Sequence, residues 1–182
     1  MQFFYNIGRY FVFVKRVFAK PEKYKLYLLN IIKEIWSLGV GSLGIVAIIS
    51  VFIGAVIALQ SAYNVTSPLF PLYYIGLGVR DSMMLEFSST IVGLILAGKV
   101  GSSIASEIGT MRVTEQIDAL EIMGINPASF LIMPKTIGML IFSPLLTILS
   151  VTIGILGGYL AVLVTSVIPL QDYLFGLTLD FV

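Results

Sequence analysis

Residues 97–134 read AGKVGSSIASEIGTMRVTEQIDALEIMGINPASFLIMP and separate two apolar tracts that carry no charge. Around the start of this segment, small residues recur every four positions, a spacing that places them on one face of a helix. A face of small residues lets a second helix approach closely, as membrane helices require. We therefore predict tight helix packing at Gly93, Ala97, Gly101 and Ala105.

The second half of the segment predicts a short amphipathic helix over residues 112–123, ended by Gly124 and Asn126-Pro127. One face is apolar and the other is acidic. A polar helix between two apolar tracts must lie in water, either as a solvated loop or as a docking element for a soluble partner. The candidate docking residues are Arg112, Val113, Glu115, Gln116, Ile117, Asp118, Leu120 and Glu121.

The composition indicates a membrane protein. Of 182 residues, 58% are hydrophobic and only 12% are charged, whereas soluble domains carry about 25% charged residues. The net charge of +1 argues against a nucleic-acid binder. The chain has no cysteine and no histidine, so we expect no disulfide, no metal site and no catalytic site of the common kinds.

Three tracts are long enough to cross a bilayer, which takes about 20 apolar residues in a helix. They cover residues 38–60, 86–109 and 137–164, and the last one holds further closely spaced glycines. Residues 1–34 interleave basic and aromatic side chains, which suits an interfacial amphipathic segment; Pro21 should end its first helix. Lys99 and Glu107 fall within the second tract, and we expect them to reach the headgroup region. The predicted fold is an all-α polytopic membrane protein.

The distribution of basic residues predicts the orientation. Residues 1–34 hold seven Lys or Arg, the loop after the first span holds only Arg80, and the loop after the second holds Arg112 and Lys135. Basic loops stay in the cytoplasm. The N-terminus and the 112–123 helix are therefore expected inside, and the first loop outside.

Two stretches resemble nucleotide-binding motifs, but neither meets the requirements of its motif. Residues 39–44 match G-x-G-x-x-G, but the dinucleotide fingerprint needs a preceding strand. Residues 93–100 read GLILAGKV and miss the P-loop pattern because Val100 replaces the magnesium-binding hydroxyl. If ATP drives this protein, we expect another subunit to bind it.

The run GKVGSSIASEIGTMRVTEQIDALEIMG, with FIGAVIALQ at 52–60, resembles the MlaE/YrbE permease family. This family often carries Arg-Glu-Leu-Gly-Pro where residues 85–89 read LEFSS, so Glu86 is kept and the Arg and Gly-Pro are not. The resemblance implies a homodimeric inner-membrane permease of a bacterial ABC transporter. It would move phospholipid or a related lipid, with ATP and Mg on an ATPase subunit and an MCE-domain partner in the periplasm.

The resemblance also makes residues 112–123 the helix that couples to the ATPase. It places a lipid cavity near the outer end of the first span, where the sequence turns from apolar to mixed at Ile57, Leu59, Gln60 and Tyr63. Family members carry further spans, so we expect a sequence truncated at its C-terminus, or else a natural short form. A permease for another hydrophobic substrate, such as a sterol, and a non-transporting membrane scaffold are the alternatives.

Overall fold

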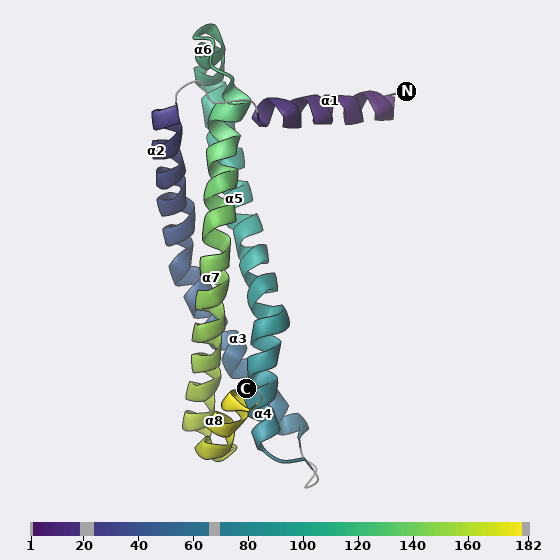
Figure 1. Ribbon diagram of the computed structural model, residues 1–182, viewed down its shortest axis with the longest axis vertical. Coiled ribbons are helices and arrows are strands. Elements are labelled where there is room, and N and C mark those ends of the chain that lie inside the picture. Colours follow the sequence, from purple (N-terminus) through teal and green to yellow (C-terminus); the bar gives the residue numbers. More distant parts are fainter. Residues whose placement is uncertain (1, 19–23, 66–69, 180–182) are drawn as a thin grey trace. The chain divides into compact units, whose positions relative to one another are not determined.

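The computed structural model describes residues 2–18, 24–65 and 70–179, and within these ranges it contains helices and no strand. Figure 1 shows the helices in chain order. The all-α prediction is confirmed. The helices are α1 (Gln2–Val17), α2 (Tyr24–Glu34), α3 (Leu43–Asn64), α4 (Tyr73–Ser82), α5 (Ser88–Val113), α6 (Gln116–Ile122), α7 (Pro127–Thr165) and α8 (Leu170–Thr178).

Within the described ranges, three helical stretches are long and apolar enough to cross a membrane: Tyr27–Asn64, Tyr73–Val113 and Pro127–Thr165. The three predicted spans are therefore confirmed, although each stretch is longer than its sequence prediction. A π-helical segment, Met83–Phe87, joins α4 to α5 without interrupting the helical path. The second stretch consequently begins well before residue 86.

The chain divides into two compact units. The first comprises Met1–Gly41 and Ala97–Phe142, and the second comprises Ser42–Leu96 and Ser143–Val182. Helices α5 and α7 each contribute residues to both units.

In the first unit, the predicted interfacial segment 1–34 separates into two different helices. Within this unit, α1 runs across the direction of α2, as an interfacial helix would (Figure 1). The prediction was wrong for α2, because Tyr27 already belongs to the first candidate span. Its charged end is tolerated there because Glu34 has a basic partner, described below. Pro21 lies outside the described residues.

A break in regular helix explains the position of Lys99 in the first unit. A π-helical segment, Ile35–Gly39, and a 3-10 turn, Val40–Ser42, separate α2 from α3. The Lys99 ammonium donates a hydrogen bond to the Gly41 carbonyl in this irregular stretch. The Lys99 side chain therefore satisfies a backbone carbonyl, and the expectation that it reaches the headgroup region stays a prediction.

The second unit packs α3 and α7 together through small residues. Ser50, Gly54 and Ala58 recur every four residues on α3 and are fully or nearly buried. The Ser50 and Ser150 hydroxyls are hydrogen-bonded at 2.8 Å. One turn further along, a Cβ on Gly54 would collide with the Gly154 backbone. The two helices thus meet at backbone distance, as small residues permit in membranes.

A second cluster in this unit closes the end of α3 against α4 and α8. Its buried core includes Ala58, Ile75, Val79, Met83, Val162, Ile168 and Tyr173. The Tyr173 hydroxyl donates to the Ile155 carbonyl at 3.3 Å. Burial raises the pKa of Tyr173, so this hydroxyl stays protonated and keeps its hydrogen bond.

Arg80 fastens the end of α8 to α4. Its side chain is buried, pairs with Asp81 at 2.9 Å and donates to the carbonyl of Leu177 at 3.2 Å. It also donates to the Leu179 carbonyl. Basic side chains commonly satisfy the last carbonyls of a helix in this way. Arg80, which lies in α4, thus caps the C-terminal end of α8.

We expect Gly54→Ala to lower the thermal stability of the purified protein, because the new methyl group would meet the Gly154 backbone rather than a side chain that can move. The expected loss is about 1–3 kcal/mol. Gly44→Ala is the matched control, because Gly44 lies in the same helix and no atom of the described residues is within 4 Å of the added carbon. Thermal unfolding followed by circular dichroism in detergent measures both, and equal melting temperatures would contradict the close packing of α3 and α7.

Candidate functional site

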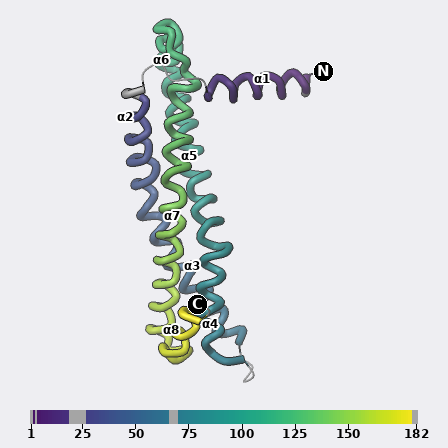
Figure 2. Tube along the Cα trace, in the orientation of Figure 1, coloured from purple at the N-terminus to yellow at the C-terminus, as the bar shows by residue number. Residues whose placement is uncertain are grey.

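Helix α6 lies at the turn between α5 and α7, which Figure 2 traces as one continuous path. It belongs to the first unit together with the adjoining ends of α5 and α7. No residue of α6 is buried. This places a short exposed helix between two candidate spans, where the sequence predicted a polar helix.

Two residues with positive φ set the ends of α6. Glu115 precedes it at φ 58° and separates it from α5. Gly124 follows it at φ 77°, and its amide donates to the Glu121 carbonyl while the Ile125 amide donates to the Leu120 carbonyl. This pair of bonds is a Schellman motif, in which glycine favours the left-handed conformation. The predicted helix stop at Gly124 is confirmed.

The predicted start of the helix was wrong. Arg112 and Val113 form the last turn of α5, and α6 begins only at Gln116. The left-handed backbone at Glu115 changes the chain direction at that point, so residues 112–123 do not form one helix. Periodicity in the sequence did not reveal this break because neither glycine nor proline marks it.

The polar side chains of the predicted docking set point outward. Glu115, Gln116, Asp118 and Glu121 are exposed. Arg112 pairs with Asp118 at 2.8 Å across the turn, with both side chains more than half exposed. Exposed pairs of this kind contribute about 0–1 kcal/mol. The pair therefore orients the turn without stabilising it much.

The structure divides the apolar candidates into two groups. Ile117 and Leu120 are half-buried against the protein, whereas Val113 is 84% exposed. Two residues that sequence reasoning missed join Val113 outside: Ile122 is 87% exposed and Met123 is 64% exposed. Both residues lie outside the helix face that contains Ile117 and Leu120. In a helix predicted to lie in water, that position was the sequence signal that they face outward.

Beneath α6, a three-membered ion network joins α2, α5 and α7. The Lys135 ammonium lies 2.6 Å from a Glu34 carboxylate oxygen and 2.6 Å from a Glu107 carboxylate oxygen. Lys135 is 3% exposed, and its carboxylate partners are progressively more open, with Glu107 the most accessible. Glu107 pairs with Lys135 while its side chain remains 44% exposed, and its expected place in the headgroup region stays a prediction. The network joins α2 to α5 and α7, the two helices that flank α6 in the chain.

A cavity of about 420 Å³ adjoins this network. Its walls include all three members of the network and Gln116, the first residue of α6. The other lining residues are Asn30, Lys33, Met111, Phe130, Leu131 and Pro134. The base of α6 is thus connected to the ion network through one shared cavity.

The predicted lipid-binding residues are distributed along the last turns of α3. Ile57 packs against the second unit's core, and Leu59 is half-buried. Gln60 and Tyr63 are exposed. The four residues therefore occupy two environments, a packed side and an open side.

The predicted small-residue seam lies on an open face of α5. Gly93, Ala97, Gly101 and Ala105 are all exposed. Among the described residues, no atom lies within 4 Å of a Cβ built on Gly93 or Gly101. The tight packing seen in this chain involves α3 and α7, including Gly154, Gly157 and Gly158 of the glycine-rich third tract.

Three candidate spans within the described ranges, with the short helix α6 between the last two, define a multi-pass helical membrane protein. The family model described as Permease MlaE matches residues 31–181, and the chain belongs to this family. A Rickettsia bellii protein named probable ABC transporter permease is 40% identical over 155 residues, which cover 85% of this chain and 60% of the relative.

A Haemophilus influenzae protein named intermembrane phospholipid transport system permease protein MlaE is 35% identical over 161 residues, covering 88% of this chain and 61% of that protein. A Synechocystis protein named probable ABC transporter permease is 35% identical over 134 residues, covering 71% of this chain and 49% of that protein. The chain thus spans about 60% of the length of the first two relatives.

Proposed function

We propose that this chain is the permease subunit of an ABC transporter in the bacterial inner membrane. It moves phospholipid or a related lipid between that membrane and a periplasmic MCE-domain partner. Membership of the Permease MlaE family supports the permease role. The name of the Haemophilus influenzae relative, which refers to intermembrane phospholipid transport, supports the lipid substrate.

The observation that carries the proposal is the exposed surface of α6 and the adjoining end of α5. It combines the outward apolar side chains of Val113, Ile122 and Met123 with acidic residues on the same short helix. Apolar anchors dominate interface energies, and charges around them set register and association rate. We assign this surface, here called the α6 surface, to the docking of the ATPase subunit, which would hold ATP and Mg.

The orientation follows from the distribution of basic residues. The N-terminus and the α6 surface face the cytoplasm, where an ATPase would be found, and the loop after α3 faces the periplasm. The open small-residue face of α5 is available for a second copy of the permease. The outer end of α3, with Ile57, Leu59, Gln60 and Tyr63, would contact the lipid cargo.

Copurification tests this proposal. The permease should be isolated from its native membrane with detergent, without added lipid, and the bound proteins and lipids should be identified by mass spectrometry. We expect an ATPase subunit, an MCE-domain protein and phospholipid. Recovery of a sterol-like molecule in place of phospholipid would favour the permease for another substrate, and recovery without ATPase would favour a non-transporting scaffold.

A further inference from the structure

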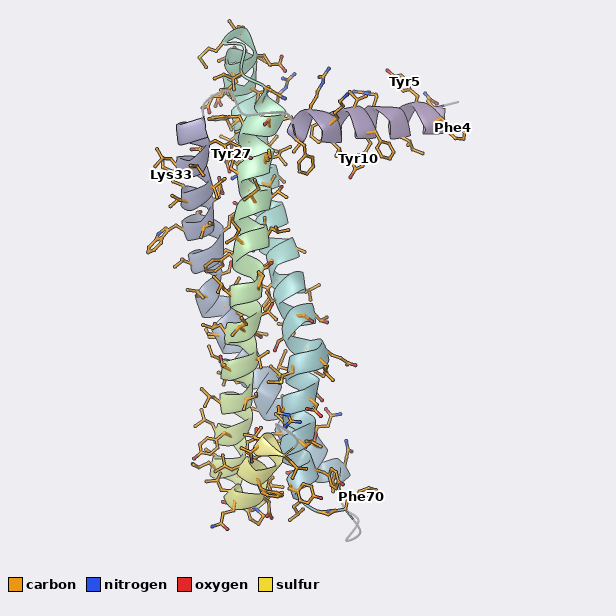
Figure 3. All side chains as sticks on the ribbon, in the orientation of Figure 1. Phe4, Tyr5, Tyr10, Tyr27, Lys33 and Phe70 are labelled. Atoms are coloured by element: carbon orange, nitrogen blue, oxygen red, sulfur yellow. The ribbon has the colours of Figure 1, made fainter. Side chains whose placement is uncertain are left out.

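Helix α1 has two chemically different faces. Ile7, Tyr10, Phe11 and Val14 follow the helical spacing of three and four residues and form an apolar face. Arg9 and Arg16 are seven residues apart, which is two turns, and lie on the opposite side. Figure 3 shows Tyr10 and Tyr5 projecting from opposite sides of this helix.

A groove runs along the basic face. Its volume is about 590 Å³, and its lining residues are Tyr5, Gly8, Arg9, Val12, Phe13 and Arg16. In the described part of the chain, no atom lies within 4 Å of a Cβ built on Gly8, so this position leaves the groove open. The Arg9 guanidinium lies 5.9 Å from the centre of the Tyr5 ring, a distance that suits a cation–π contact.

The charge of this face is not balanced within α1. Residues 2–18 include three basic side chains and no acidic one. The Asn126 amide binds the Arg16 backbone carbonyl at 2.8 Å, a contact that does not involve the guanidinium. An anion is therefore the complementary ligand for the groove.

We propose that this groove binds the headgroups of anionic phospholipids in the surrounding bilayer. An amphipathic helix lies with its apolar face about 5–10 Å into the boundary between headgroups and acyl chains. In that position the opposite face of α1 is level with lipid phosphates. Guanidinium groups bind phosphate through paired hydrogen bonds, and the open space at Gly8 admits a headgroup between Arg9 and Arg16.

This inference goes beyond the proposed function, because it concerns resident lipid and not the transported cargo. The phosphate that binds belongs to a bilayer lipid, because the apolar face of the same helix holds the groove at the membrane surface. A variant that loses headgroup binding should therefore still bind the ATPase subunit.

The test measures lipids retained by the purified full chain. The permease is equilibrated with equal amounts of phosphatidylglycerol, which is anionic, and phosphatidylcholine, which is zwitterionic, and bound lipids are counted by native mass spectrometry. We expect phosphatidylglycerol to be enriched. Arg9→Gln combined with Arg16→Gln should lower that enrichment about tenfold, whereas Lys15→Gln, outside the groove, should lower it less.

Gly8→Leu distinguishes binding in the groove from attraction by charge alone, because it fills the groove and keeps both arginines. Leucine favours helix more than glycine does and adds apolar surface, yet it would fill the groove. We expect this variant to stay folded and to lose the preference for phosphatidylglycerol. The proposal is overturned if the double arginine variant or Gly8→Leu keeps the parent preference, or if millimolar inorganic phosphate displaces the bound lipid.

Discussion

Replacing Ile122 and Met123 together by serine is expected to weaken binding of the ATPase subunit about 30-fold or more, as loss of central interface anchors does. Both side chains are largely exposed in the chain, so their truncation should not disturb packing. The melting temperature of the permease should stay at the parent value. Affinity can be measured by surface plasmon resonance with the permease in nanodiscs.

Ile122→Leu with Met123→Leu is the matched control, because it keeps apolar area at both positions. We expect this variant to bind like the parent. If the serine variant also binds like the parent, the α6 surface does not dock the ATPase. If both variants lose binding equally, shape alone decides the contact and the assignment of apolar anchors fails.

Lys135→Met is expected to destabilise the first unit by about 3–5 kcal/mol, the usual result of removing one partner from a buried ion pair. The change would leave the Glu34 and Glu107 carboxylates without their ammonium. Lys33→Met is the control, since Lys33 lines the same cavity but is exposed. Thermal unfolding in detergent should show a large loss for Lys135→Met and little change for Lys33→Met.

A double variant tests the physical reason. Lys135→Met with Glu34→Met replaces the more buried pair by apolar side chains and leaves Glu107, the most exposed member, able to reach water. Such replacements are often neutral or stabilising relative to the broken pair. The double variant should melt above Lys135→Met; if it melts lower, burial of an unpaired charge is not the cause.

The spans could be predicted because a bilayer requires long apolar helices whatever their neighbours are. Their ends could not, because they depend on contacts between distant residues. The first span was predicted to begin at residue 38, but the helical stretch begins at Tyr27 and includes Glu34, which pairs with Lys135, 101 residues away. A charge pattern along one chain does not show such a partner.

Small-residue spacing identified faces suited to close packing but did not show which face is covered within this chain. The face on α5 with Gly93 and Gly101 is open, whereas the one on α3 with Ser50 and Gly54 is packed. Both follow the same four-residue spacing. Whether such a face is packed depends on which helix lies opposite it, and only the tertiary structure shows this.

The candidate docking residues were predicted to lie on one amphipathic helix over residues 112–123, and the structure divides this segment between α5 and α6. The left-handed backbone at Glu115 assigns Val113 to α5 and starts α6 at Gln116. Because of this break, helical spacing counted from Val113 does not hold across the turn. Ile122 and Met123 were therefore overlooked as the outward apolar residues.

Cysteine accessibility at Ala119 tests the central claim most directly, because the chain has no cysteine of its own and Ala119 is exposed on α6. We expect a membrane-impermeant thiol reagent to label Ala119→Cys only after the cells are permeabilised, and added ATPase subunit to slow the labelling. Asn64→Cys, at the end of α3, should be labelled in intact cells. Labelling of Ala119→Cys in intact cells, or labelling that the ATPase does not slow, would contradict the assignment of α6 as the cytoplasmic docking helix.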